Sequence, residues 1–232
     1  MVTSSLQNVV FNMMLLRNAL IVSTLLYSTH SASAQTSAPS AAKPMQTVQM
    51  PAPPEPVAVA LKGATTALLV SDMIDPTCKT QPKCTTTMVP AIAGLLERAR
   101  KAGVMVVHAT RAGNAAKFLP ETSPAAGDPI IASFGQDRFY NTKLDETLKA
   151  KGITTVVLTG WKISGSVLYT SIGATLRDYT VVIPKDASLA GPDYEEAIGI
   201  FQILNQSSAN TANEPLKPKT TTISRTDMIS FQ

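Results

Sequence analysis

The chain has 232 residues, 44% of them hydrophobic, and a formal net charge of +4 at pH 7. This length can bury one good core, so we expect a single domain once the chain ends are discounted. The basic residues form no cluster and no aromatic residues are interleaved with them, which disfavours a nucleic-acid partner and favours a small-molecule partner.

The first 34 residues have the pattern of a secretory signal peptide. Arg17 precedes an apolar run over residues 19–27, and Ala32-Ser33-Ala34 forms a small-x-small cleavage site. The apolar run has about half of the roughly 20 residues that span a bilayer, so a retained membrane anchor is the weaker interpretation. We therefore expect a periplasmic or secreted protein with no membrane partner after cleavage.

The segment 35–60 is predicted to be a flexible linker, because it is rich in Ala, Ser, Thr and Gln and its prolines block regular structure. The folded domain is expected to cover residues 61–232. The sequence leaves open whether translation starts at Met1, Met13 or Met14.

Cys78 and Cys84 are the only cysteines, and they lie in a loop rich in Pro and Thr. In an oxidising compartment such a pair favours a disulfide. Metal coordination is the alternative, but neither His30 nor His108 completes a ligand set with ordinary spacing. We predict no metal and no cofactor.

After residue 60, apolar runs typical of strands alternate with helical patterns. The expected strands cover residues 66–70, 104–107, 155–158, 180–183 and 221–223. The expected helices cover residues 89–102, 143–151, 166–177 and 193–204. Continuously apolar strands are typical of a parallel sheet covered on both faces, so we predict an α/β fold with a doubly wound parallel sheet.

Open parallel sheets bind ligands beyond the carboxyl ends of their strands. That rule points to three segments: Ser71-Asp72 after the first strand, residues 108–111 after the second, and residues 160–166 after the third. The third segment leads from strand to helix, so the amides around Ser166 have no intrahelical acceptor and can receive an anion.

Four motifs in this order resemble the isochorismatase-like superfamily of cysteine hydrolases. They are Ala67-Leu68-Leu69-Val70-Ser71-Asp72, Phe139 with the helix that follows it, Thr159-Gly160 with Ser166, and the strand ending in Pro184-Lys185-Asp186-Ala187. The resemblance covers residues 65–205 and implies a three-layer α/β/α domain with an Asp-Lys-Cys triad that hydrolyses small amides or, in the isochorismatases proper, a vinyl ether.

Only Asp72 matches that triad. By the resemblance it is the catalytic acid/base, although it can also be an Asp that caps the following loop. Ser133 stands six residues before Phe139, where the family has its lysine, so the expected cation is absent and Ser133 becomes a candidate for neutral substrate binding. Ser166 stands at the cysteine position, where it can be a nucleophile whose hydroxyl requires an activating base. It can also be a residue at the helix N-terminus that hydrogen-bonds the local backbone.

The turn before Ser166 supplies the remaining candidates for substrate binding: Trp161, Lys162 and Gly165. Lys162 can serve as the base for Ser166 or be a solvated loop residue. Trp161 can stack on a planar ligand or fill space between helix and strand. The resemblance also implies a non-proline cis peptide near Trp161-Lys162.

Two functions remain open. The first is an exported hydrolase of a small amide, ester or vinyl ether, with Asp72 and Ser166 as catalytic residues. The second is a catalytically inactive protein that retains the pocket and binds a ligand. The metal-binding histidines of nicotinamidase-like members are missing after Asp72, which disfavours a nicotinamidase, and the sequence is compatible with a homo-oligomer.

Overall fold

The computed structural model describes residue 47, residues 49–206 and residues 208–232. The predicted signal peptide and residues 35–46 of the predicted linker lie outside these ranges. The chain divides into two units after Val48, and the second unit, Gln49–Gln232, contains every helix and strand described below. Regular structure in this unit begins with β1 at Val59, inside the segment predicted to be a linker.

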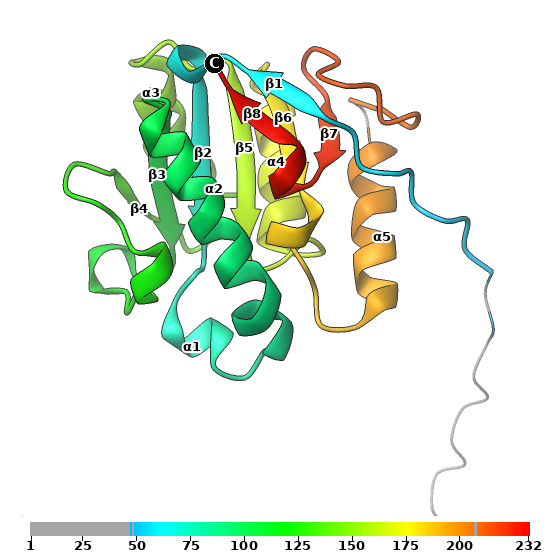
Figure 1. The fold of residues 1–232 in the computed structure, drawn as a ribbon, viewed down its shortest axis with the longest axis horizontal. Helices are drawn as coiled ribbons and strands as arrows, with labels where there is room; N and C mark the ends of the chain where they lie inside the picture. Colours follow the sequence, from blue (N-terminus) through cyan, green and yellow to red (C-terminus); the bar gives the residue numbers. More distant parts are fainter. Residues whose placement is uncertain (1–46, 48, 207) are drawn as a thin grey trace, which may run out of the picture. The chain divides into compact units, whose positions relative to one another are not determined.

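The centre of the second unit is a six-stranded parallel sheet with the strand order β4-β3-β2-β5-β6-β7 (Figure 1). Its strands are β2 (Thr66–Ser71), β3 (Met105–Thr110), β4 (Ile130–Ala132), β5 (Thr155–Gly160), β6 (Thr180–Pro184) and β7 (Thr221–Ser224). The order steps outward in both directions from β2 and β5, so the predicted doubly wound α/β fold is confirmed.

Burial explains why these apolar runs form strands. Every residue of β2 is buried, as expected for a central strand covered on both faces. The register pairs Ser71 with Ala109 of β3 on one side and with Gly160 of β5 on the other. The carboxyl ends of these three strands are therefore level, and the residues that follow them meet at one edge of the sheet.

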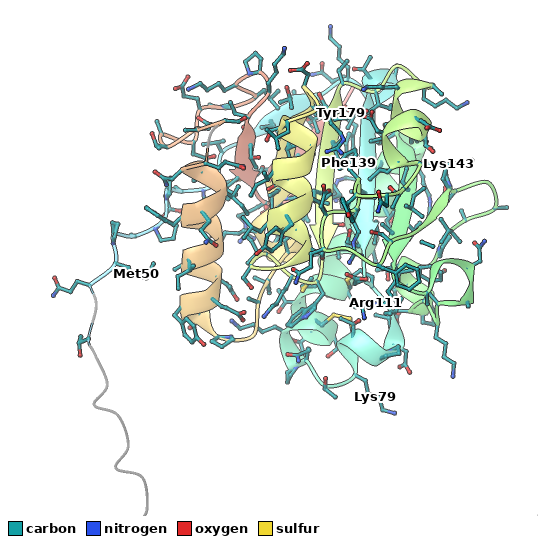
Figure 2. The ribbon with its side chains drawn as sticks, turned by 180° about the vertical axis from the view of Figure 1, so that it is seen from behind. Met50, Lys79, Arg111, Phe139, Lys143 and Tyr179 are labelled. Atoms are coloured by element: carbon teal, nitrogen blue, oxygen red, sulfur yellow. A yellow bond between two sulfur atoms is a disulfide. The ribbon has the colours of Figure 1, made fainter. Side chains whose placement is uncertain are left out.

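Helices cover the two faces in separate layers (Figures 1 and 2). The helices are α1 (Asp75–Cys78), α2 (Val89–Lys101), α3 (Leu144–Lys149), α4 (Ser166–Thr175) and α5 (Asp193–Leu204). Apolar residues of α3, α4 and α5 pack in one core with Leu69 and Leu158, whereas those of α2 pack in a second core with Leu68 and Val157. Alternate residues of each strand thus serve opposite faces.

Segments that are distant in sequence pair with each other near the two ends of the described domain. β1 (Val59–Leu61) pairs in parallel with β8 (Ile229–Phe231) in a small second sheet. The N–H of Val57 donates to the carbonyl of Ile223 at 3.1 Å, and the Ser224 hydroxyl donates to the carbonyl of Val57 at 2.7 Å. The chain just before β1 therefore lies along the edge strand β7. Among the described residues, no helix combines the length and the apolar character needed to cross a membrane.

Candidate active site

A pocket of about 260 Å³ opens at the carboxyl ends of β2, β3 and β5. Its lining residues are Asp72, Arg111, Phe134, Gly135, Gln136, Arg138, Trp161, Lys162, Gly165 and Ser166. A second hollow beside α5 is lined by residues 50–54 and by Ala197, Ile200, Phe201, Leu204, Asn205 and Thr211, none of which titrates. Of these two pockets, only the first is lined by side chains that can take part in acid–base chemistry.

Asp72 follows β2 directly and has a backbone φ of 56°. Its N–H donates to the carbonyl of Ala109 at 3.0 Å, which fixes the residue against β3. Burial raises the pKa of the Asp72 carboxyl above its usual value, while the charge of Arg138, the nearby Ser166 hydroxyl and the charge of Arg111 all act to lower it. Burial is the largest of these effects, so the pKa of Asp72 lies above that of a free aspartate although its neighbours favour the ionised form.

Arg138 is the ion-pair partner of Asp72. Its side chain is 6% exposed. Its Nη2 contacts the Asp72 carboxylate, and its Nη1 donates to the carbonyl groups of Ser133 and Gly135, both at 3.1 Å. Burial lowers the pKa of Arg138 and the carboxylate of Asp72 opposes that shift. The sequence has no cation at position 133, and in the structure a guanidinium from a position five residues further along the chain pairs with Asp72 instead.

Ser133 does not line the pocket. It is 1% exposed, and its hydroxyl donates to the carbonyls of Gly135 at 3.3 Å and Asp137 at 3.5 Å. Its own carbonyl accepts from Arg138. In this structure Ser133 helps to hold Arg138 in place and has no direct access to a ligand.

The turn between β5 and α4 forms one wall of the pocket. It begins at Gly160, where a Cβ atom would lie 1.9 Å from the carbonyl oxygen of Ser71 and where φ is +117°, so only glycine fits. A cis peptide joins Trp161 to Lys162, as the resemblance implied. Trp161 is half-buried against the core on the α2 face and also reaches the pocket.

Lys162 is ion-paired with Glu195 of α5. The same carboxylate oxygen accepts a hydrogen bond from the Ser164 hydroxyl at 3.0 Å, and Lys162 lowers the pKa of Glu195. The ammonium group is thus engaged away from Ser166, and the structure does not form the Ser-Lys arrangement considered from the sequence.

Ser166 is the first residue of α4 and is 6% exposed. Its hydroxyl donates to the carbonyl of Trp161 at 2.7 Å. Its amide lies in the first turn of the helix, where no intrahelical acceptor exists, so this N–H is available to an oxyanion. The site therefore brings a hydroxyl, a carboxylate, a guanidinium and a helix N-terminus to one pocket.

Comparison with protein families places this site in a known context. The model of the isochorismatase domain matches residues 66–212, which is more than half of the chain and includes every lining residue of the pocket. The chain belongs to the isochorismatase family.

Curated relatives of this isochorismatase-family chain include two ureidoacrylate amidohydrolases named RutB. The protein from Yersinia enterocolitica is 37% identical over 92 residues, which cover 37% of this chain and only 38% of the relative. The protein from Stutzerimonas stutzeri is 26% identical over 67% of this chain and 82% of the relative.

Solved structures show the same fold at low identity. N-carbamoylsarcosine amidase from Thermoplasma acidophilum is 23% identical, with a TM-score of 0.58 over 70% of this chain and 97% of that one. A cysteine hydrolase from Pseudomonas syringae is 20% identical, with a TM-score of 0.61 over 75% of this chain and 94% of that one.

The predicted loop staple is present in this isochorismatase-family chain. Cys78 at the end of α1 and Cys84 are joined by a disulfide, with 5.2 Å between their Cα atoms, and both residues are buried. Within the described part of the chain, no group of three His, Cys, Asp or Glu side chains is arranged to hold a metal ion.

Five pocket residues were not named as site residues in the sequence analysis: Arg111, Phe134, Gly135, Gln136 and Arg138. Arg111 lies in the segment after the second predicted strand, so the rule on strand ends pointed to its position but not to its role. The other four follow Ser133 within five residues. Their shared signal was proximity to the family's lysine position, from which a guanidinium several residues away can still reach Asp72.

Proposed function

We propose that this isochorismatase-family chain hydrolyses a small amide, with Ser166 as the nucleophile and Asp72 as the acid/base. The observation that carries the proposal is the convergence of Asp72, Arg138 and Ser166 on one pocket. The amide is favoured over an ester or a vinyl ether because the curated relatives are named amidohydrolases and one structural neighbour is an amidase.

In the proposed reaction, the Asp72 carboxylate accepts the hydroxyl proton of Ser166 as Oγ bonds to the substrate carbonyl carbon. The carbonyl oxygen becomes an oxyanion and is received by the amide of Ser166 at the N-terminus of α4. Asp72 then gives its proton to the leaving nitrogen as the C–N bond breaks. Water hydrolyses the resulting ester by the same steps, with Asp72 as its base.

Arg138 has a positioning role in this scheme. Its ion pair with Asp72 favours the ionised carboxylate that accepts the proton, and its bonds to the Ser133 and Gly135 carbonyls keep it from rotating away. Ser166 must exchange its hydrogen bond to the Trp161 carbonyl for one to Asp72 before it attacks.

The test is a panel of small amides, with matched esters and vinyl ethers, offered to the wild-type protein and to Ser166→Ala and Asp72→Asn. We expect turnover of at least one amide, and a loss of at least about 100-fold in each variant because general acid–base and nucleophilic catalysis both fail. Ser230→Ala, on β8 and away from the pocket, is the control and should keep wild-type activity. Equal activity in all four proteins contradicts the proposed roles.

Ser166→Cys provides a second, independent readout. A thiol at the N-terminus of α4 is expected to ionise more readily than a free cysteine. Its alkylation by iodoacetamide should therefore exceed that of a cysteine in the unfolded chain at pH 7. Alkylation no faster than in the unfolded chain contradicts an activating environment at this position.

A second candidate function is ligand binding without turnover. It is favoured by the engagement of the Ser166 hydroxyl with the Trp161 carbonyl and of Lys162 with Glu195, since in this structure the hydroxyl donates to a backbone carbonyl and Lys162 is paired elsewhere. The amide panel separates the two candidates, because a binding protein gives saturable binding with no product in wild type and in Ser166→Ala.

The location of the protein is also a proposal. We infer export from the signal-like pattern of residues 1–34, and the Cys78–Cys84 disulfide supports an oxidising compartment. Fractionation of cells that express the full chain, followed by non-reducing mass spectrometry, tests this inference. Recovery in the cytosol with an uncleaved N-terminus contradicts it.

A further inference from the structure

The charged groups of the pocket do not cancel. Arg138 pairs with Asp72, and Lys162 pairs with Glu195 outside the lining. Arg111 is the remaining charged side chain of the lining. No ion pair or side-chain hydrogen bond joins Arg111 to another residue of the described chain. The pocket therefore carries one uncompensated positive charge.

Arg111 is placed to face a ligand. It directly follows Thr110, the last residue of β3, and β3 neighbours β2, from which Asp72 emerges. Its charge lowers the pKa of both Asp72 and Arg138, as expected for a cation beside that ion pair. Figure 2 shows Arg111 beyond the lower end of the sheet in that view. Its side chain is exposed, so a ligand can reach it.

The surroundings favour a planar anion with a single charge. A guanidinium presents two parallel N–H donors that match the two oxygens of a carboxylate. The Asp72 carboxylate in the same lining repels a second negative charge, which disfavours a phosphate dianion. Trp161 and Phe134 add aromatic surface to the lining and suit a small ligand with an apolar or planar middle.

We propose that Arg111 binds a carboxylate of the ligand, so that the pocket selects small monoanionic carboxylates and holds their amide or other reacting group toward Ser166. The inference rests on the proposed function only in taking this pocket as the ligand site. It assigns Arg111 as a specificity-determining residue and not as a group that takes part in bond breaking.

Trp161 allows binding to be measured without turnover. It is the only tryptophan of the chain and it lines the pocket, so its fluorescence reports ligands that enter. The probes are succinamate, which has one carboxylate and one amide, its neutral diamide succinamide, and inorganic phosphate. Titrations use the full wild-type chain and Ser166→Ala, in which turnover is absent.

We expect succinamate to bind about tenfold more tightly than succinamide, which corresponds to about 1.4 kcal/mol for one charge-assisted pair. Arg111→Gln should abolish that preference, and Arg111→Lys should retain only part of it. Lys79→Gln is the matched control, because it removes an exposed positive charge outside the pocket lining (Figure 2) and should leave the preference unchanged. High salt should weaken the binding of succinamate only.

Three results overturn the inference: equal binding of succinamate and succinamide, a preference that survives Arg111→Gln, or tighter binding of phosphate than of succinamate. Absence of any response to all probes also counts against it. A carboxylate preference in a protein that hydrolyses nothing would instead refute the proposed hydrolysis and leave the role of Arg111 intact.

Discussion

The guanidinium of Arg138 joins the carboxylate of Asp72 to the backbone of the loop at Ser133 and Gly135. One terminal nitrogen contacts the carboxylate, and the other is shared by the two carbonyls. Removal of either charge therefore leaves the other one buried, so the two residues are expected to act as a single unit in both stability and chemistry.

Arg138→Gln should lower the free energy of unfolding by on the order of 3 kcal/mol, because the Asp72 charge then loses its partner in a largely buried site. The double variant Asp72→Asn with Arg138→Gln should lose less than the sum of the two single changes. Urea unfolding at pH 7 measures all three proteins. Lys149→Gln, which breaks an exposed pair on α3, is the control and should cost at most about 0.5 kcal/mol. Additive single changes would show that the pair is not coupled.

His108 should make the protein sensitive to mild acid. The ring is fully buried in β3 and its Nε2 lies 3.6 Å from an oxygen of Asp128, beyond hydrogen-bond distance. Burial lowers the pKa of His108 to about 4, against an opposing effect of Asp128. The unfolded chain, with an ordinary histidine pKa, then binds more protons than the native state between about pH 6.5 and pH 4.

The neutral, buried His108 makes its full contribution to the free energy of unfolding above about pH 6.5. That contribution is lost as the pH falls toward 4, by up to about 3 kcal/mol. His108→Leu should remove this part of the pH dependence, since leucine needs no hydrogen-bond partner in the core. Urea unfolding of both proteins at several pH values gives the comparison. An identical pH profile in His108→Leu would exclude this histidine as the cause.

Two glycines should respond to alanine in opposite directions. Gly160→Ala forces a methyl group onto the Ser71 carbonyl at a positive φ, so we expect a loss of roughly 3 kcal/mol or more, or no folded protein. Gly94 lies in α2 with no atom closer than 3.7 Å to an added Cβ, and alanine there should stabilise by about 0.5–1 kcal/mol. Thermal unfolding distinguishes the two, and similar effects at both positions would contradict the geometry.

The disulfide should contribute about 2 kcal/mol, since it closes a loop with a sequence separation of only 6 between Cys78 and Cys84. The double variant Cys78→Ala with Cys84→Ala should lose about that amount and become insensitive to reductant. Thermal unfolding with and without dithiothreitol, on both proteins, makes the measurement. A wild-type protein that does not change with reductant would argue against the bond.

Most of the main sheet could be predicted from the sequence because burial on both faces demands continuously apolar runs, which are visible without any knowledge of partners. β4 was missed because it has three residues and follows Pro129, a pattern typical of loops. β1 and β8 were missed because each is short and each is paired only by the other, from the opposite end of the sequence. Local pattern contains no information on such pairing.

The site was predictable to the extent that it follows strand ends. Asp72, Trp161, Lys162, Gly165 and Ser166 were named and do line one pocket. Arg138, the partner of Asp72, was not predicted, because the family resemblance assigns the cation only to the position of the family's lysine. A long side chain can deliver its charge from a different backbone position, and neither spacing nor composition shows that Arg138 points inward while Ser133 turns to its own loop.

The chain before β1 has a consequence for how this protein can be produced and processed. Because Val57 bonds Ile223 and Ser224 on the outer side of β7, this segment shields a strand whose backbone groups would otherwise be open to other molecules. The proposed cleavage after Ala34 would leave this cover intact. A chain trimmed to begin beyond Val57 keeps every pocket residue, yet it presents an uncovered strand edge and should self-associate. Such a chain is expected to lose solubility although its pocket is complete.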